Sequence, residues 1–172
     1  MAGEIKILII LIIGILFIKF ALKKPLNQIL FVLIIGTIFG ATFQSILGEE
    51  LNCYNGNINL YIGYVSVGIV IAWGIGLTAI YFISRFVIDT FGLRPGVVYY
   101  ILIGIILTIG IEAVGYNIVK IQLVKQYPSL FPLFNCMHAP LVLYFYYLIV
   151  AVLFYFFITI SHNKIVYLTG SR

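Results

Sequence analysis

The feature that most limits how this chain can fold is a series of long apolar runs. They cover approximately residues 5–22, 29–50, 61–86, 97–119 and 132–160. An α-helix needs about 20 apolar residues to cross the hydrocarbon core of a bilayer, whereas a strand of a membrane barrel shows short segments of alternating polar and apolar residues. The runs are nearly continuous and of helical length. The pattern therefore predicts a bundle of five transmembrane α-helices.

Composition supports an all-α integral membrane protein with a single transmembrane domain over residues 1–172. Hydrophobic residues make up 63% of the chain and charged residues 9%, and the mean hydropathy is +1.19. A soluble domain needs far more polar surface than this. The run over 132–160 is too long for a straight span, so we expect it to tilt or to bend near Pro140.

The positions of the basic residues predict the orientation of the chain. The net charge is +5, but the basic residues form no stripe that would indicate a nucleic-acid partner. One side of the predicted bundle carries three of them, Lys6, Lys120 and Lys125. The other side carries seven, namely Lys19, Lys23, Lys24, Arg85, Arg94, Lys164 and Arg172. Because cytoplasmic loops are enriched in Lys and Arg, we expect a multi-pass protein of the cell membrane, with its N-terminus outside and its C-terminus in the cytoplasm.

A short motif occurs twice, at the outer ends of the second and fourth predicted helices. Residues 48–55 are GEELNCYN, and residues 110–117 are GIEAVGYN. The positions that agree are Gly48/Gly110, Glu50/Glu112, Tyr54/Tyr116 and Asn55/Asn117. This agreement predicts a tandem duplication of a helical hairpin, formed by helices two and three and by helices four and five, with the first helix as an addition.

Glu112 is the strongest candidate for chemistry. It lies roughly 10 Å below the outer end of its helix, at 1.5 Å per residue, and an ionised carboxylate at that depth is costly. Such a group faces a cavity, has a partner or carries a proton. Tyr116 follows one turn later on the same face. Two interpretations stay open: a carboxylate that binds a ligand or handles protons, and a structural hydrogen bond between helices.

His138 is expected about one and a half turns into the fifth helix, where it would reach Glu112 from the same side of the membrane. A Glu–His pair supplies an acid and a base, or a proton relay, so both are candidate catalytic residues. Asn117 and Asn135 lie at a similar depth and are expected to orient the pair. The alternative is a histidine that donates to a neighbouring carbonyl.

Three further features belong to the predicted site or lie beside it. Glu50 is the counterpart of Glu112 in the repeated motif, with a solvated carboxylate at a helix end as the alternative. Trp73 has small neighbours and either lines a cavity or packs in the core. The aromatic run at 144–147 is predicted to face lipid, with a ligand groove as the alternative.

The two cysteines carry little functional information. Cys53 and Cys136 form no C-x-x-C motif, so neither a metal nor a redox cofactor is expected. Both fall near the predicted outer face. They either join the two hairpins through a disulfide, which requires Cα atoms within about 7 Å, or they are free thiols.

Together these residues predict a polar pocket near the outer leaflet that binds, and is able to modify, a lipophilic ligand such as a lipid or an isoprenoid. The expected partners are membrane lipids and a lipophilic small molecule. Two alternatives stay open: a small transporter or transporter subunit, and a non-catalytic assembly or scaffold subunit. The scaffold alternative depends on Gly36 and Gly40, a G-x-x-x-G pattern suited to binding a second copy or another membrane protein. Whether the protein is an enzyme is left open.

Overall fold

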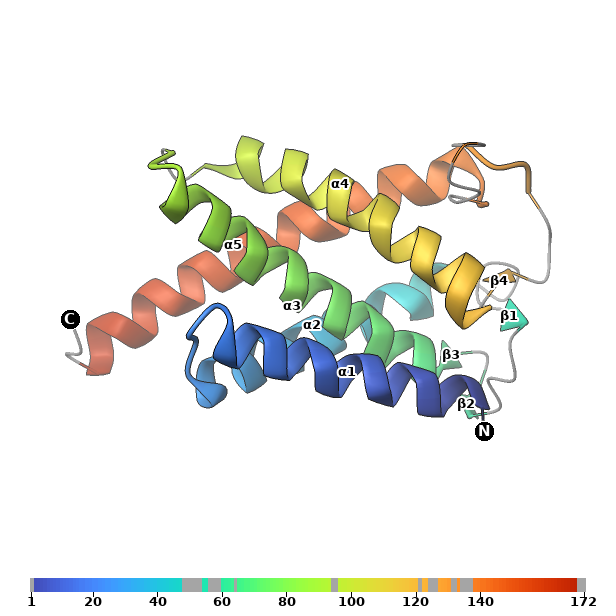
Figure 1. Cartoon of the computed structure of the whole chain (residues 1–172), viewed down its shortest axis with the longest axis horizontal. Coiled ribbons are helices and arrows are strands. Elements are labelled where there is room, and N and C mark those ends of the chain that lie inside the picture. Colours follow the sequence, from blue (N-terminus) through green and yellow to red (C-terminus); the bar gives the residue numbers. More distant parts are fainter. Residues whose placement is uncertain are drawn as a thin grey trace.

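The computed structural model of the chain describes residues 2–47, 54–55, 60–63, 65–93, 96–120, 122–123, 127–130, 133 and 138–169. These residues are mostly helical (Figure 1). The long helices are α1 (Ala2–Phe20), α2 (Leu26–Leu47), α3 (Val67–Thr90), α4 (Val97–Val114) and α5 (Leu141–Thr169). A π-helical turn, η2 (Gly115–Val119), continues α4. The short strands are β1 (Tyr54–Asn55), β2 (Tyr61–Ile62), β3 (Val65–Ser66) and β4 (Gln122–Leu123).

The all-α class expected from the sequence is confirmed. Four helical segments are long and apolar enough to cross a membrane, namely Leu26–Ile46, Val67–Thr90, Val97–Ile118 and Leu141–Ser161. The helix α1 is a further apolar helix of 19 residues. This arrangement is compatible with a multi-pass membrane protein.

The helix α3 lies at the centre of the bundle. It contacts α1, α2, α4 and α5, and 56% of its apolar span is buried, against 11% of the α4 span. Its buried residues Leu77, Ile80 and Phe82 join side chains of α2 and α5 in the main hydrophobic core.

Small residues bring α2 and α3 into close contact. A Cβ atom added at Gly36 would lie 3.1 Å from the Gly74 carbonyl oxygen, and one added at Gly40 would lie 2.7 Å from the Trp73 Cβ. Side chains at these positions would hold the two backbones apart, which is why small residues are favoured where membrane helices pack closely. The contact also fixes the position of Trp73.

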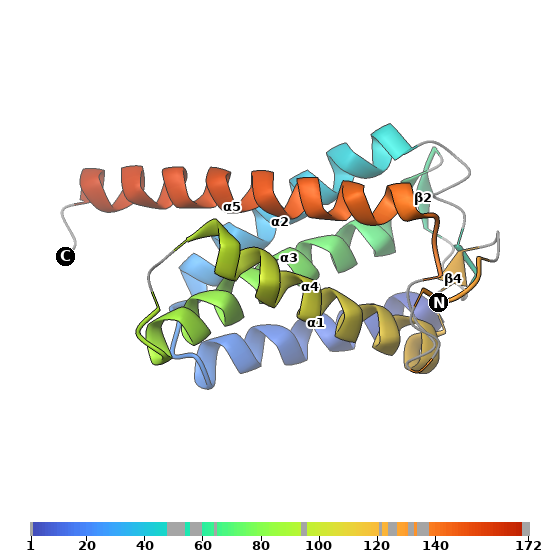
Figure 2. The same ribbon diagram turned by 90° about the horizontal axis from the view of Figure 1, so that it is seen from above.

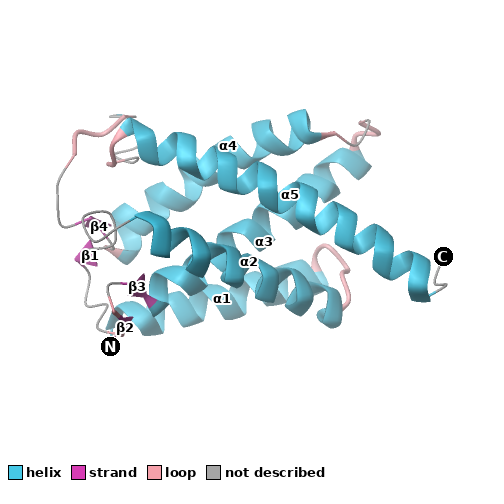
Figure 3. Ribbon diagram, turned by 180° about the vertical axis from the view of Figure 1, so that it is seen from behind, coloured by secondary structure: helices cyan, strands magenta, loops and turns pink. Residues whose placement is uncertain are grey.

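All four strands lie at one end of the bundle, which we call the strand end (Figures 1 and 3). The strands β1 and β4 pair antiparallel, with Tyr54 opposite Leu123 and Asn55 opposite Gln122. The segments that follow α2 and α4 therefore meet at the same end, as the topology predicted. The N-terminus lies at the strand end and the C-terminus at the opposite end.

Two helix starts differ from the prediction. The third helix was expected from residue 61, but Tyr61–Ile62 and Val65–Ser66 form a small antiparallel hairpin and α3 begins at Val67. The reason is local: Gly63 has a positive φ of 63°, and the Ser66 hydroxyl caps the helix by accepting from the Ile69 N–H at 3.4 Å. A side-chain oxygen at this position satisfies an otherwise unpaired donor of the first turn.

The fifth helix begins at Leu141 and ends at Thr169, not at 132 and 160. The predicted bend at Pro140 is wrong, because Pro140 precedes the helix and accepts a hydrogen bond from the Leu143 N–H at 2.9 Å. Figure 2 shows α5 as a straight helix that extends beyond the others towards the C-terminus. His138 consequently lies before the helix and not inside it.

The structure gives the two copies of the repeated motif different backbones. Tyr54 and Asn55 form strand β1, whereas Tyr116 and Asn117 lie in the π-helical turn η2. Gly48 and Glu50 lie outside the described residues. The duplication of a helical hairpin therefore stays a prediction.

Candidate functional site

A cavity of about 200 Å³ lies between α3, the α4–η2 segment and α5. Its walls are mainly apolar and include Leu77, Ile80 and Ile111. The polar groups that reach it come from all three sides and are carried by Trp73, Thr108, Glu112, Tyr116 and Tyr147. Small residues on both sides, among them Gly76 and Gly115, leave the space open. We call this cavity the α3–α5 pocket.

Glu112 lies in the last turn of α4, and its side chain is half-buried in the wall of the pocket. Within the described part of the chain, it is the only Asp, Glu, Lys, Arg or His residue that lines the pocket. Within the apolar span Val97–Ile118 it is also the only charged residue. The apolar sequence of α4 gives no structural reason for a carboxylate at this position. The place of Glu112 beside a cavity is therefore the feature that most indicates a function.

The turn after Glu112 is unusual. Residues Gly115–Val119 form a π-helix, a geometry that occurs mostly as single turns and frequently at functional sites. Lys120 ends this turn with a left-handed backbone, at a φ of 64°, and its N–H donates to the Gly115 carbonyl. The wider turn carries Tyr116 into the wall of the pocket beside Glu112.

Two aromatic residues from different helices meet at the pocket wall. The rings of Trp73 in α3 and Tyr147 in α5 are 4.7 Å apart between centroids and make an angle of 84°. This is the edge-to-face geometry that aromatic pairs prefer. Both interpretations left open for Trp73 describe its position, because it lines the pocket and also packs against the hydrophobic core. Tyr147, in the aromatic run predicted to face lipid, instead faces the interior.

His138 supports the pocket from behind Tyr116. The two rings are stacked, with centroids 3.9 Å apart and an angle of 14° between them. The His138 Nδ1 is 2.9 Å from the Tyr127 carbonyl oxygen. A carbonyl only accepts, so this contact places a proton on Nδ1.

His138 and Glu112 are also electrostatic neighbours. The two groups are close enough for a positive charge on the imidazole to act on the carboxylate. His138 does not line the pocket itself. The bond to the Tyr127 carbonyl is the alternative that the sequence left open for this histidine, and a catalytic role for the pair stays a prediction.

The other predicted site residues lie elsewhere or outside the described part of the chain. The Asn117 side-chain amide donates to the Ala113 carbonyl of its own helix at 2.9 Å, and Asn117 does not line the pocket. Glu50 and Asn135, like Cys53 and Cys136, lie outside the described residues. Of the predicted site, the structure therefore brings together Glu112, Tyr116 and Trp73, with His138 behind them.

Two polar residues of the pocket were not predicted. Thr108 precedes Glu112 by four residues, so the same helical spacing that selected Tyr116 also indicates Thr108. Tyr147 gives no such signal, because α5 is apolar on all sides in this region. Within the described residues, no group of three or more His, Cys, Asp or Glu side chains lies close enough together to hold a metal ion.

Comparison with protein-family models, with curated proteins and with solved structures finds no match for this chain.

Proposed function

We propose that the chain is an integral membrane protein. The outer surface supports this, because large apolar side chains are exposed on α1, α2, α4 and α5, for example Ile13 at 60%, Ile106 at 69% and Val142 at 66%. Soluble monomers rarely expose contiguous apolar surface on this scale. The spans Leu26–Ile46 and Leu141–Ser161 contain no charged residue. A bilayer is the solvent in which such a surface is stable.

We further propose that the α3–α5 pocket binds a lipophilic or amphiphilic ligand, such as a lipid or an isoprenoid chain. The observation that carries the proposal is a mainly apolar cavity of about 200 Å³ with a single carboxylate, Glu112, in its wall. An apolar cavity of about 150 Å³ accommodates benzene, so this one suits a ring or a short part of a larger ligand. Glu112 and Tyr116 would hold the polar end of that ligand.

The scaffold alternative loses its main support. Gly36 and Gly40 contact α3 of the same chain, so the G-x-x-x-G face of α2 is occupied inside the bundle. Transport of the bound ligand stays the alternative function, and flux of the ligand across liposome membranes would establish it. Acid–base chemistry by Glu112 and His138 on the ligand stays a prediction.

The experiment is native mass spectrometry of the protein extracted with its own lipids, with the wild type beside Glu112→Gln. A defined lipophilic molecule that stays on the wild type and is lost from the variant supports the pocket as a binding site. The matched control is Asp89→Asn, because Asp89 is an exposed carboxylate at the other end of α3. If wild type and Glu112→Gln carry the same set of lipids, the proposal is wrong and Glu112 has a structural role.

A further inference from the structure

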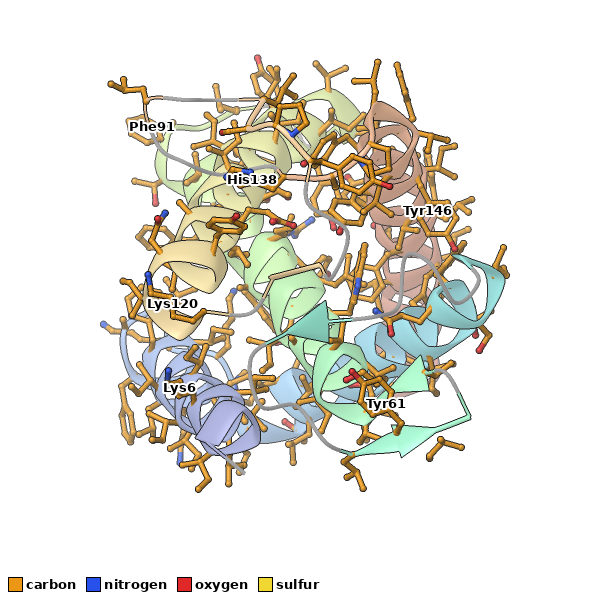
Figure 4. The ribbon with its side chains drawn as sticks, turned by 90° about the vertical axis from the view of Figure 1, so that its right-hand side faces the viewer. Lys6, Tyr61, Phe91, Lys120, His138 and Tyr146 are labelled. Carbon is orange, nitrogen blue, oxygen red and sulfur yellow. The ribbon has the colours of Figure 1, made fainter. Side chains whose placement is uncertain are left out.

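The formal charge on the described wall of the pocket is negative. Among the residues that the structure describes, Glu112 contributes the only formally charged side chain there, and no Lys or Arg lines the pocket. Basic residues described at other positions lie towards the two ends of the bundle, as Lys6 and Lys120 do at the strand end (Figure 4). A buried charge is stable only when it is paired or hydrogen-bonded. Among the described lining residues there is therefore no cation to pair with an ionised Glu112, and His138 acts on the carboxylate only from behind Tyr116, outside the lining.

Aromatic rings surround the place where such a cation would lie. Trp73 comes from α3, Tyr116 from η2 and Tyr147 from α5. The rings of Trp73 and Tyr147 form an edge-to-face pair, and one face of the Tyr116 ring is covered by His138. Three aromatic side chains around one small space provide the negative ring faces that attract an organic cation, most strongly Trp.

The chemistry of the walls also selects the kind of cation. A hydrated metal ion needs several oxygen ligands, and the pocket wall offers one carboxylate and a few hydroxyls among apolar side chains. A substituted ammonium group holds its surrounding water weakly and has an apolar outer surface. It can therefore enter an apolar, aromatic space without ligands that replace a hydration shell.

Building on the ligand site proposed above, we infer that the α3–α5 pocket recognises the head of a cationic amphiphile, a tertiary or quaternary ammonium group. Glu112 neutralises the charge, and Trp73 and Tyr147 contact the alkyl groups around the nitrogen. The apolar remainder of the ligand lies along Ile111, which is 44% exposed at the rim of the pocket. No covalent step is involved.

The chain contains its own probe, because Trp73 is its only tryptophan. The protein is held in the uncharged detergent dodecyl maltoside, whose head group contains no ammonium, and is titrated with benzyltrimethylammonium. The matched neutral compound is 2,2-dimethylpropylbenzene, in which a carbon replaces the nitrogen. Binding is followed by Trp73 emission and by isothermal titration calorimetry. We expect saturable binding of the cation, about tenfold or more tighter than that of the neutral compound.

Variants test which groups supply the preference. Glu112→Gln should remove the preference for the cation, whereas Asp89→Asn should keep it. Tyr147→Phe, which keeps the ring, should keep the ratio of the two affinities, and Tyr147→Leu should lower it. Circular dichroism and size-exclusion chromatography check that each variant is folded. Glu112→Asp, which keeps a carboxylate, should retain part of the preference and serves if Glu112→Gln does not fold.

The outcomes separate this inference from the function on which it rests. If the neutral compound binds as tightly as the cation, or if folded Glu112→Gln keeps the preference, the inference is wrong and the lipophilic pocket stands. If neither compound binds but mass spectrometry finds a Glu112-dependent lipid, again only the inference is wrong. If no compound and no lipid binds the folded wild type, both proposals are wrong.

Discussion

Gly110 and Gly115 are five positions apart, and only a side chain added at Gly115 would extend into the α3–α5 pocket. A Cβ atom added at either residue meets no heavy atom within 4 Å. Gly115 lines the α3–α5 pocket and Gly110 does not. We expect Gly115→Leu to occupy the cavity and to weaken ligand retention about tenfold or more, in the range of lost hydrophobic contacts. Gly110→Leu should leave retention unchanged.

The readout for this pair is ligand retention in native mass spectrometry together with the thermal unfolding temperature in the same detergent. Both variants should unfold near the wild-type temperature, because a Cβ atom at either position meets no heavy atom within 4 Å. Equal retention by both variants would show that the ligand is held elsewhere on the molecule.

A tyrosine hydroxyl of α5 makes a hydrogen bond to α2. The Tyr146 hydroxyl donates to the Phe43 carbonyl at 2.7 Å, and the two rings also pack edge to face at 5.4 Å. Tyr146→Phe removes only the hydrogen bond, which between membrane helices averages about 0.6 kcal/mol and reaches about 1.7. We expect the free energy of unfolding, measured by titration with a denaturing detergent, to fall by that amount. Tyr99→Phe, on the exposed side of α4, is the control and should change it little.

Among single residues, the sequence predicted those site residues that helical spacing places on the same face. Glu112 and Tyr116 were found because residues four apart share a face, and Thr108 obeys the same rule. Trp73 was open to two interpretations, a cavity wall and core packing. Its position depends on the close contact with Gly40 and on the ring of Tyr147, and neither could be predicted from the sequence. The depth of His138 was wrong because it depended on the start of α5.

Small residues allow α2 and α3 to pack closely against each other. At Gly40, an added Cβ would lie 2.7 Å from the Trp73 Cβ and 3.0 Å from the Val70 carbonyl oxygen. Backbone atoms cannot yield there, so we expect Gly40→Ala to destabilise the protein by about 1–3 kcal/mol, as overpacking does. The displaced Trp73 should also change its emission maximum. Both effects are measured on the purified protein in detergent.

Gly110→Ala is the matched substitution for that experiment. It makes the same chemical change in a helix where no neighbour lies within 4 Å, so it should keep the stability and the Trp73 emission of the wild type. If Gly40→Ala and Gly110→Ala behave alike, the close contact between α2 and α3 is not what holds the helices together.

The existence of the helices could be predicted, and their ends less well. Apolar runs of this length have few structures open to them, which is why all the expected helices are present. Their boundaries depend on short local features, such as the Ser66 cap and the turn at Gly63. Such features are difficult to recognise inside a long apolar run. Pro140 was predicted to bend the fifth helix, but proline is also well tolerated at the start of a helix, where no backbone N–H is needed.

The arrangement of the whole bundle fixes which charged segments share a side. Lys6 and Lys120 belong to the strand end, whereas Lys19 lies in the last turn of α1 and Lys23 and Lys24 follow that helix at the other end. The sequence predicts three basic residues on one side and seven on the other. Packing inside the bundle does not depend on which side faces the cytoplasm. The orientation is therefore decided by these charges against the membrane.

The last prediction follows from this difference in charge. In a bacterial inner membrane, a green fluorescent protein fused to the C-terminus should fluoresce, and alkaline phosphatase at the same position should be inactive, because the C-terminus is expected in the cytoplasm. Replacing Lys19, Lys23 and Lys24 by glutamine leaves four basic residues on that side against three on the other. The fusions to this variant should report a mixture of orientations. Active phosphatase on the wild-type C-terminus would show that the orientation is the opposite of the predicted one. The α3–α5 pocket, which lies towards the strand end, would then open near the inner leaflet.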